Sequence, residues 1–209
     1  MSLHTWWLFS VSVFALSGTP GPNMLHILSR SVDVGFKRST TAMAGCLLAL
    51  VAILSASAAG LTTLLLAVPG AFEVLRYAGV AYLLYLGVRS WRSKVAPLDV
   101  GAADVPLALS TTAMFRAGFT IGISNPKLIL FAAAFLPQFV NPAAPKGPQF
   151  AILVATFAAS DCFWYLVYAA GGRSLSRHLA RPSIKRAFNR LTGAIFVGFG
   201  LLLLRAKPS

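Results

Sequence analysis

Charged residues are scarce in this chain of 209 residues, and acidic ones are the scarcest. Only 11% of the residues are charged, with 5 Asp and Glu against 18 Lys and Arg. Soluble domains carry about a quarter of charged residues, so this composition excludes a domain that faces water on all sides. The mean hydropathy of +0.74 and the long apolar blocks indicate membrane helices, since the short alternating pattern of membrane strands is missing.

Cysteine and histidine are also rare. The two cysteines, Cys46 and Cys162, lie in apolar segments and form no CxxC pair, so the sequence predicts neither a disulfide framework nor a zinc site. The three histidines, His4, His26 and His178, are scattered along the chain. We therefore expect no metal site, no cofactor and no catalytic residues, and a protein that is not an enzyme.

Six apolar segments approach or exceed the length needed to cross a bilayer. They cover residues 6–28, 42–68, 72–88, 117–139, 150–171 and 191–204. The stretch before the first segment has no Lys or Arg, so we expect that segment to be retained rather than cleaved as a signal peptide. The sequence thus predicts an all-α integral membrane protein with six transmembrane helices.

The basic residues predict the orientation of these helices. Most of them lie in the loops after the first, third and fifth segments: Arg30, Lys37, Arg38, Arg89, Arg92, Lys94, Arg116, Arg173, Arg177, Arg181, Lys185, Arg186 and Arg190. Under the positive-inside rule these loops are cytoplasmic and both termini lie outside. The basic excess then sets topology and contacts anionic lipid headgroups, so we expect no nucleic-acid partner.

The six segments resemble two copies of a three-helix unit. The third and sixth share the pattern Arg-x-x-Gly-x-x-aromatic, which begins at Arg76 and at Arg190. An odd number of crossings in each copy gives the two copies opposite orientations. The chain is therefore expected to form one membrane domain, 1–209, with a first repeat at 1–92, a cytoplasmic linker at 93–116 and a second repeat at 117–209.

Proline interrupts the first and fourth segments near their middle, in GTPGPN (18–23) and SNPK (124–127). Proline removes an amide donor and clashes with the preceding turn, and a membrane tolerates the free backbone groups only inside protein or beside a watery cavity. Paired breaks in two halves point to a binding site at the membrane midplane. The candidate substrate-binding residues at the breaks are Pro20, Gly21, Pro22, Asn23, Asn125 and Pro126.

Two charges of opposite sign, Lys127 and Asp161, lie near the centres of the fourth and fifth segments. Each costs at least about 2.5–3.5 kcal/mol at a helix centre on insertion scales, so a partner or a function must retain it. One interpretation is a structural ion pair between them. The other is substrate binding, in which Lys127 attracts a carboxylate while Asp161 holds a cation or carries a proton.

Several motifs resemble the LysE/RhtB family of amino-acid exporters. The matching segments are SGTPGPNM (17–24), the GFKR turn (35–38) with Gly45 beyond it, YAGVAYLLYLGVR (77–89), NPKLILFAAAFLPQFV (125–140) and NRLTGAIFVGFGLLL (189–203). The resemblance covers nearly the whole chain. It implies a multi-pass carrier of the bacterial inner membrane that exports amino acids or close derivatives in exchange for protons.

Carried over position by position, the resemblance places Pro20–Asn23 in the first family motif and Asn125–Lys127 in the second. It places Asp161 at an acidic position of the fifth segment, where this residue would bind substrate and couple protons. The family commonly has Asp where this chain has Asn23, which leaves the coupling ion open. Trp164 and Tyr165, close after Asp161, are expected mainly to pack.

Two other functions stay open. An exporter of inorganic or metal cations on the same scaffold would need clustered acidic, Cys or His ligands within the spans. An intramembrane thiol-electron carrier would need Cys46 and Cys162 to meet. Oligomerisation also stays open, because small residues such as Gly45 and Gly118 suit helix contacts within and between chains equally well.

Overall fold

The chain is helical throughout the part that the computed structural model describes, residues 1–67, 71–92, 110–141, 143–179 and 181–205. No strand occurs in these ranges, which confirms the predicted all-α class. The helices in chain order are α1 (Leu3–Gly18), α2 (Pro22–Val34), α3 (Phe36–Ala67), α4 (Ala71–Arg92), α5 (Thr111–Ile123), α6 (Pro126–Ala134), the 3-10 helix η1 (Leu136–Phe139), α7 (Lys146–Leu179) and α8 (Pro182–Arg205).

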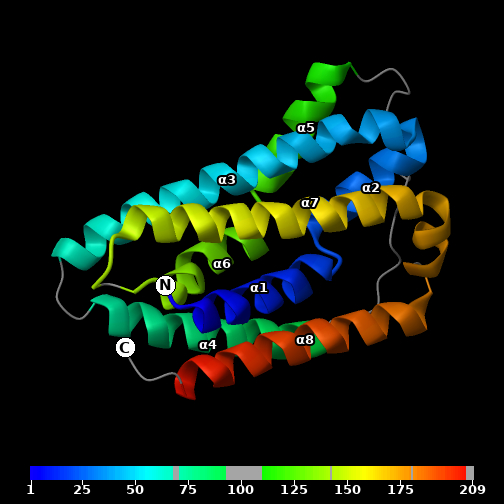
Figure 1. Cartoon of the computed structure of the whole chain (residues 1–209). Helices are drawn as coiled ribbons and strands as arrows, with labels where there is room; N and C mark the ends of the chain where they lie inside the picture. The colour runs from blue at the N-terminus through cyan, green and yellow to red at the C-terminus, as the bar shows by residue number, and fades with distance from the viewer. Residues whose placement is uncertain (68–70, 93–109, 142, 180, 206–209) are drawn as a thin grey trace.

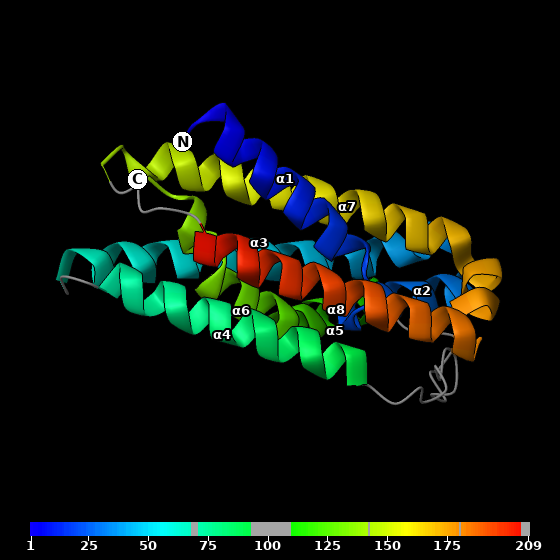
Figure 2. The ribbon, with the colours of Figure 1, turned by 90° about the horizontal axis from the view of Figure 1, so that it is seen from below.

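The long helices lie side by side in an elongated bundle (Figures 1 and 2). In Figure 1, α3 and α7 run along one side and α4 and α8 along the other, with α1 and α6 between them. α5 crosses α3 and projects beyond the bundle, while α2 packs against α7. The short helix α1 lies on the outside of the bundle beside α7, as Figure 2 shows, with Val11 exposed.

Short non-helical segments separate α1 from α2 and α5 from α6. Thr19 (φ −74°, ψ 133°) and Gly21 (φ −125°, ψ 179°) are extended between α1 and α2. Pro22 and Pro126 occupy the first position of α2 and α6, where a helix needs no amide hydrogen and proline's fixed φ is already helical. In both motifs proline thus starts a new helix.

Two glycines allow sharp bends, one before a long helix and one within another. Gly35 has φ 84° between α2 and α3, and Gly172 has φ 41° at a kink within α7. This left-handed region is strained for residues with a Cβ atom. The GFKR turn noted in the sequence therefore needs its glycine to reverse the chain direction.

Small residues bring α3 and α5 into backbone contact. A Cβ atom on Gly45 would collide with the carbonyl of Phe115, and one on Gly118 with the carbonyl of Ala42. The Cys46 thiol donates a hydrogen bond to the Gly118 carbonyl at 3.3 Å. These small residues, which the sequence left free to act within or between chains, serve a crossing within the chain.

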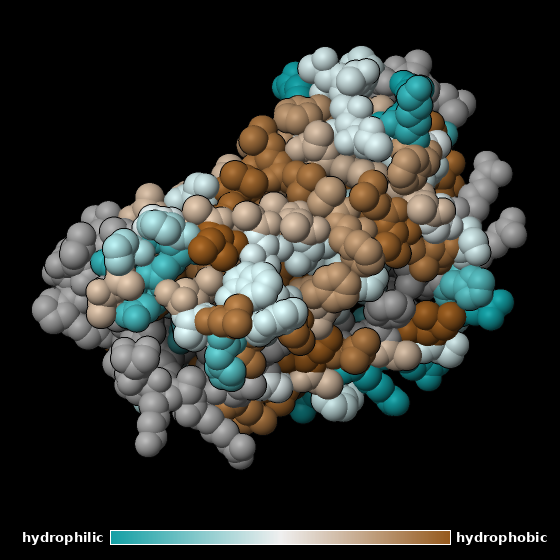
Figure 3. Space-filling model, viewed as in Figure 1, coloured by the Kyte–Doolittle hydropathy of each residue, from teal (hydrophilic) through white to brown (hydrophobic). Residues whose placement is uncertain are grey.

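The surface of the bundle is apolar around its middle. Exposed large apolar side chains include Val11 on α1, Leu48 on α3, and Phe163 and Leu166 on α7. Figure 3 shows apolar residues across the central band of one face, with hydrophilic residues nearer the ends. By length and composition, two described stretches could cross a membrane, Phe36–Gly60 and Lys146–Gly172.

The basic segments gather at one end of the bundle. The α2–α3 junction, the last turn of α4, the first turn of α5 and the α7–α8 junction all lie at this end (Figures 1 and 2). They contain basic residues of the three predicted cytoplasmic loops. Most of the predicted linker, residues 93–109, lies outside the described residues, as do the side chains of the third-segment repeat pattern at Arg76, Gly79 and Tyr82.

Candidate functional site

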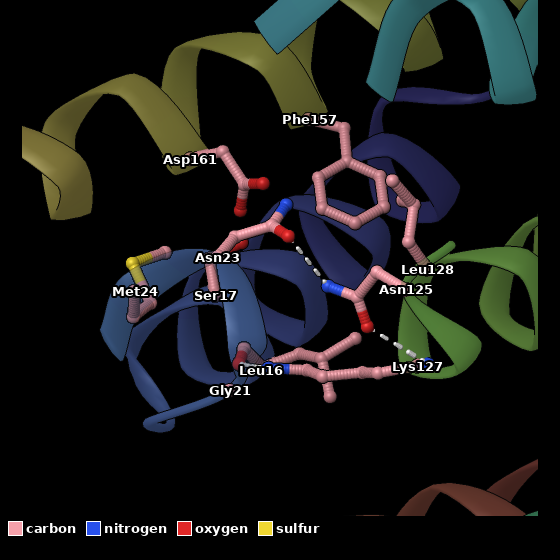
Figure 4. Close-up of a pocket in the computed structure, with 10 residues that line it drawn as sticks. All are labelled: Leu16, Ser17, Gly21, Asn23, Met24, Asn125, Lys127, Leu128, Phe157 and Asp161. Atoms are coloured by element: carbon pink, nitrogen blue, oxygen red, sulfur yellow. Dashed lines mark hydrogen bonds between the residues drawn. The ribbon is translucent and has the colours of Figure 1, made fainter. Parts of the chain in front are cut away.

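A small cavity lies where the two interrupted segments meet, and α7 closes its remaining side (Figure 4). Its lining residues are Leu16, Ser17, Gly21, Asn23, Met24, Asn125, Lys127, Leu128, Phe157 and Asp161. The cavity volume is about 30 Å³, which is enough to hold at least one water molecule. Segments that lie far apart in the sequence therefore meet at one point.

Five of the eight predicted site residues line this cavity: Gly21, Asn23, Asn125, Lys127 and Asp161. The three prolines do not line it. Pro22 and Pro126 begin α2 and α6, and Pro20 lies in the segment between α1 and α2. The structure thus brings the polar members of both motifs together, while the prolines shape the backbone around them.

Four buried polar side chains form a continuous hydrogen-bond chain beside the cavity. Asn125 Nδ2 donates to Asn23 Oδ1 at 3.0 Å, and Asn23 Nδ2 donates to Tyr165 Oη at 3.0 Å. The Tyr165 hydroxyl donates to Asp161 Oδ2 at 3.1 Å. None of the four residues is more than 6% exposed. The chain links the starts of α2 and α6 to the middle of α7.

The backbone of α6 sets the direction of this chain. Asn125 caps α6, and its Oδ1 accepts a hydrogen bond from the Lys127 backbone amide at 3.1 Å. Because an amide N–H can only donate, the Oδ1 atom of Asn125 must face it, and Nδ2 must face Asn23. Asn23 then accepts with Oδ1 and donates with Nδ2, which leaves the Tyr165 proton for the carboxylate.

The Lys127 side chain closes the end of α1. Its Nζ atom donates to the Leu16 carbonyl and to Thr19 Oγ1, each at 2.6 Å, and lies 3.4 Å from the Thr19 carbonyl. The last carbonyls of a helix have no partner within the helix and carry the negative end of its dipole. An ammonium group from α6 therefore neutralises the open end of α1.

Lys127 and Asp161 do not form a direct ion pair. The salt bridge found among the described side chains is a different one, between Arg30 and Asp33 on α2, with a nitrogen–oxygen distance of 3.2 Å. Lys127 bonds to α1, whereas Asp161 bonds to Tyr165. Of the two interpretations of these charges, the structural ion pair is therefore wrong for this structure, and both groups lie at the same cavity with different partners.

Side chains of α7 complete the end of α1. Trp164 Nε1 donates to the Phe14 carbonyl and the Tyr168 hydroxyl to the Gly18 carbonyl, each at 2.9 Å. We expected Trp164 and Tyr165 mainly to pack, but both make specific hydrogen bonds. Their spacing from Asp161 gives the signal that the sequence analysis missed, because residues 161, 164, 165 and 168 share one face of a helix.

One polar atom in the cavity wall is left without a partner. The Ser17 hydroxyl is buried, at 2% exposure of the residue, and lies near the Asp161 carboxylate but makes no hydrogen bond of good geometry. Figure 4 shows it on the side of the cavity toward which the Asp161 carboxylate points. A buried hydroxyl without a partner is costly, so this position suits a polar group of a bound molecule.

The described residues do not support the two alternative functions, an exporter of inorganic or metal cations and an intramembrane thiol-electron carrier. Within the described residues, no three His, Cys, Asp or Glu side chains are grouped as metal ligands. Cys46 is buried and bonds to the α5 backbone, and Cys162 is partly exposed on α7. Neither thiol lines the cavity.

Comparison with known proteins places the chain in a family. The family described as LysE type translocator matches residues 14–207. An uncharacterized membrane protein of Vibrio cholerae is 31% identical over 207 residues, which cover 99% of this chain and 100% of the relative. No solved structure matches.

Two further relatives carry functional names. A homoserine/homoserine lactone efflux protein of Salmonella typhi is 29% identical over 210 residues, 99% of both chains. A leucine efflux protein of Salmonella choleraesuis is 30% identical over 200 residues, 95% of this chain and 93% of the relative. The match covers both helix breaks and Asp161, and the chain belongs to the LysE family of membrane translocators, which are transport proteins and not enzymes.

Proposed function

We propose that this protein exports amino acids or close derivatives from the cytoplasm in exchange for protons, and that substrate binds at the cavity between the two interrupted segments. The observation that carries the proposal is the meeting of an ammonium, a carboxylate and two helix breaks in one buried place. The names of the efflux relatives support this class of substrate.

The proposed membrane arrangement has six spans in two inverted repeats. α1 with α2, and α5 with α6, are the first and fourth spans, each broken near the midplane. Each long helix packs against the broken pair of the other half, α3 against α5 and α6, and α7 against α1 and α2, as two related halves require. With the basic end in the cytoplasm of a bacterial inner membrane, both termini lie outside.

The cavity offers partners for both ends of a zwitterion. A substrate ammonium would bind the Asp161 carboxylate and the neighbouring Ser17 hydroxyl. A substrate carboxylate would bind Lys127 and the first amides of α2, whose N-cap residue Gly21 supplies no side-chain cap. Helix N-termini favour negative charge for the same reason that their amides lack partners.

Substrate binding requires the cavity to widen. The cavity of about 30 Å³ leaves room for water, and an amino acid is expected to need more space, so we assign the structure to a closed state. The contacts of Lys127 with α1 and of Asn125 with α2 join the two halves across the cavity. Rocking of one repeat against the other would break these contacts on one side at a time and so give alternating access.

Asp161 is the proposed coupling group. A substrate ammonium and a proton would compete for its carboxylate, so that binding of one releases the other. The proton would then enter from the outside and leave to the cytoplasm while substrate moves outward. Coupling without a proton leak also requires that the carrier reorients only when Asp161 holds a proton or a substrate ammonium.

Counterflow in liposomes tests the proposal. Liposomes that contain the purified protein would be loaded with unlabelled amino acid. The entry of labelled homoserine, leucine and other amino acids into them would be measured at two pH values. We expect exchange of one or a few amino acids, lost in K127M and kept in K146M, in which the replaced lysine lies at the start of α7 outside the cavity. Absence of exchange in folded, inserted wild-type protein would contradict the proposal.

A further inference from the structure

The Asp161 carboxylate has two oxygens with different surroundings. Oδ2 accepts a hydrogen bond from the Tyr165 hydroxyl. Tyr165 is the donor of good geometry to this carboxylate among the described side chains, while the Ser17 hydroxyl lies near the carboxylate without such geometry, on the side to which Figure 4 shows it pointing. The Tyr165 hydroxyl has a single proton and accepts a hydrogen bond from Asn23 Nδ2. Its own proton is therefore directed to Asp161 Oδ2 by its neighbours.

From this geometry we infer that Tyr165 is the positioning residue for proton coupling: it occupies Oδ2 of Asp161 and leaves Oδ1 as the atom for which proton and substrate ammonium compete. The competition between proton and substrate at Oδ1 rests on the proposed function. The positioning role of Tyr165 rests on the hydrogen-bond chain alone.

The fixed direction of the hydrogen-bond chain makes the two carboxylate oxygens of Asp161 unequal. A proton placed on Oδ2 would face the Tyr165 proton, and two donors would then point at each other. A proton on Oδ1 leaves the Tyr165 bond in place but weakens it, because a neutral acid is a poorer acceptor than a carboxylate. The proton therefore arrives at Oδ1 from water in the cavity and returns there.

The same hydrogen-bond chain couples the charge of Asp161 to both interrupted segments. Tyr165 is joined to Asn23 at the start of α2, and Asn23 to Asn125 at the start of α6. Hydrogen bonds in a buried chain polarise one another, so protonation of Asp161 weakens the contact between the two broken segments. Loss of the charge thus loosens the closed state of the cavity.

The charged and titratable groups around Asp161 come from three helices. Lys127 on α6, Tyr165 on α7 and Cys46 on α3 interact with it electrostatically among the described side chains. From α1 the Ser17 hydroxyl lies close enough to act on the carboxylate, and from α2 the neutral Asn23 completes the surroundings. Of these groups, only Tyr165 donates a hydrogen bond of good geometry to the carboxylate.

Infrared titration of the protein in lipid tests this inference without relying on transport. The chain has only 5 acidic residues, so the carbonyl band of protonated Asp161 can be identified as the band that D161N lacks. In Y165F the ionised form loses a donor, and we expect Asp161 to bind its proton about tenfold more tightly, because hydrogen bonds to charged groups are the strong ones. The midpoint of the band then moves to higher pH, by about one unit.

Y168F is the matched comparison, because it removes a buried hydroxyl from the same helix, one that bonds to the Gly18 carbonyl instead. We expect its Asp161 band to keep the wild-type midpoint. In counterflow, the D161N/Y165F double variant should show the same pH profile as D161N alone. Equal midpoints in wild type and Y165F, or equal shifts in Y165F and Y168F, would overturn the inference.

The two proposals fail in different ways. A band that shifts in Y165F, in a protein that exchanges no amino acid, would uphold the role of Tyr165 and remove the proposed function. Amino-acid exchange by wild type, with a Y165F band and pH profile identical to wild type, would uphold the proposed function and remove the role of Tyr165.

Discussion

The ammonium nitrogen of Lys127 lies 2.6 Å from the carbonyl oxygen of Leu16. This contact joins the start of α6 to the end of α1, two helices that begin and end at proline-containing motifs. A lysine near the middle of an apolar segment is thereby held by backbone carbonyls and not by a carboxylate. Together with the hydrogen bonds from Thr19, Trp164 and Tyr168 to the last carbonyls of α1, this contact lets the end of the helix be buried.

Removal of the Lys127 ammonium should lower both stability and transport. In K127M the Leu16 carbonyl and the Thr19 hydroxyl lose a charged donor, while the bonds from Thr19 to the Leu16 carbonyl remain. We expect the free energy of unfolding to fall by about 1.5–3 kcal/mol, the contribution of a hydrogen bond to a charged group. Thermal unfolding in detergent measures this change. K146M should unfold like wild type, and equal stability of K127M and K146M would show that Lys127 does not support α1.

Replacement of Asp161 should separate binding from coupling. D161N keeps the size of the side chain and an oxygen for the Tyr165 hydroxyl, but it cannot exchange a proton. We therefore expect D161N to bind substrate weakly and to exchange it at a rate that no longer depends on pH. Counterflow between pH 6 and pH 8 gives the profile, and a pH dependence like that of wild type would exclude Asp161 from coupling.

A change of Asn23 to aspartate should reverse the direction of the hydrogen bond between residue 23 and the Tyr165 hydroxyl. The carboxylate introduced by N23D could only accept hydrogen bonds, so it would take one from Asn125 Nδ2 and one from the Tyr165 hydroxyl, which then no longer donates to Asp161. We expect N23D to move the midpoint of the Asp161 infrared band to higher pH, as in Y165F. N141D adds a charge outside the cavity as a control, and its midpoint should stay at the wild-type value.

The α3–α5 crossing should be sensitive to single methyl groups. In G45A the new Cβ atom would collide with the Phe115 carbonyl of α5, and overpacking of this kind costs about 1–3 kcal/mol. Gly60 on the same helix has nothing within 4 Å of an added Cβ, so G60A should match or exceed wild type, because Ala favours helix more than Gly. Similar melting temperatures for the two variants would contradict the close crossing.

The sequence predicted the class of the fold and singled out residues that the structure brings together, but not their partners. Long apolar blocks predicted helices, and the family resemblance is confirmed. The paired Asn–Pro motifs drew attention to Asn23 and Asn125, and both line the cavity, although their role in binding stays a prediction. Local patterns suffice for these features because proline and hydropathy act within a few residues.

The contacts of Lys127 and Tyr165 could not be predicted in the same way. Opposite charges suggested a pair with Asp161, but the end of α1 lies within hydrogen-bond distance of Lys127 and offers several oxygens. Tyr165 looked like a packing residue because its partners, Asn23 and Asp161, lie 142 and 4 residues away in the sequence. Only the packing of α2 against α7 brings the more distant one within reach.

The most direct test of the cavity as the substrate site uses a reporter inside it. In an S17C/C46A variant, a small thiol reagent would be applied with and without the amino acid that the protein exchanges, and Cys162, which does not line the cavity, would serve as the internal control. We predict that the amino acid slows modification of the introduced cysteine and leaves that of Cys162 unchanged. Equal rates of modification at position 17 with and without substrate, in protein that still exchanges it, would contradict the site.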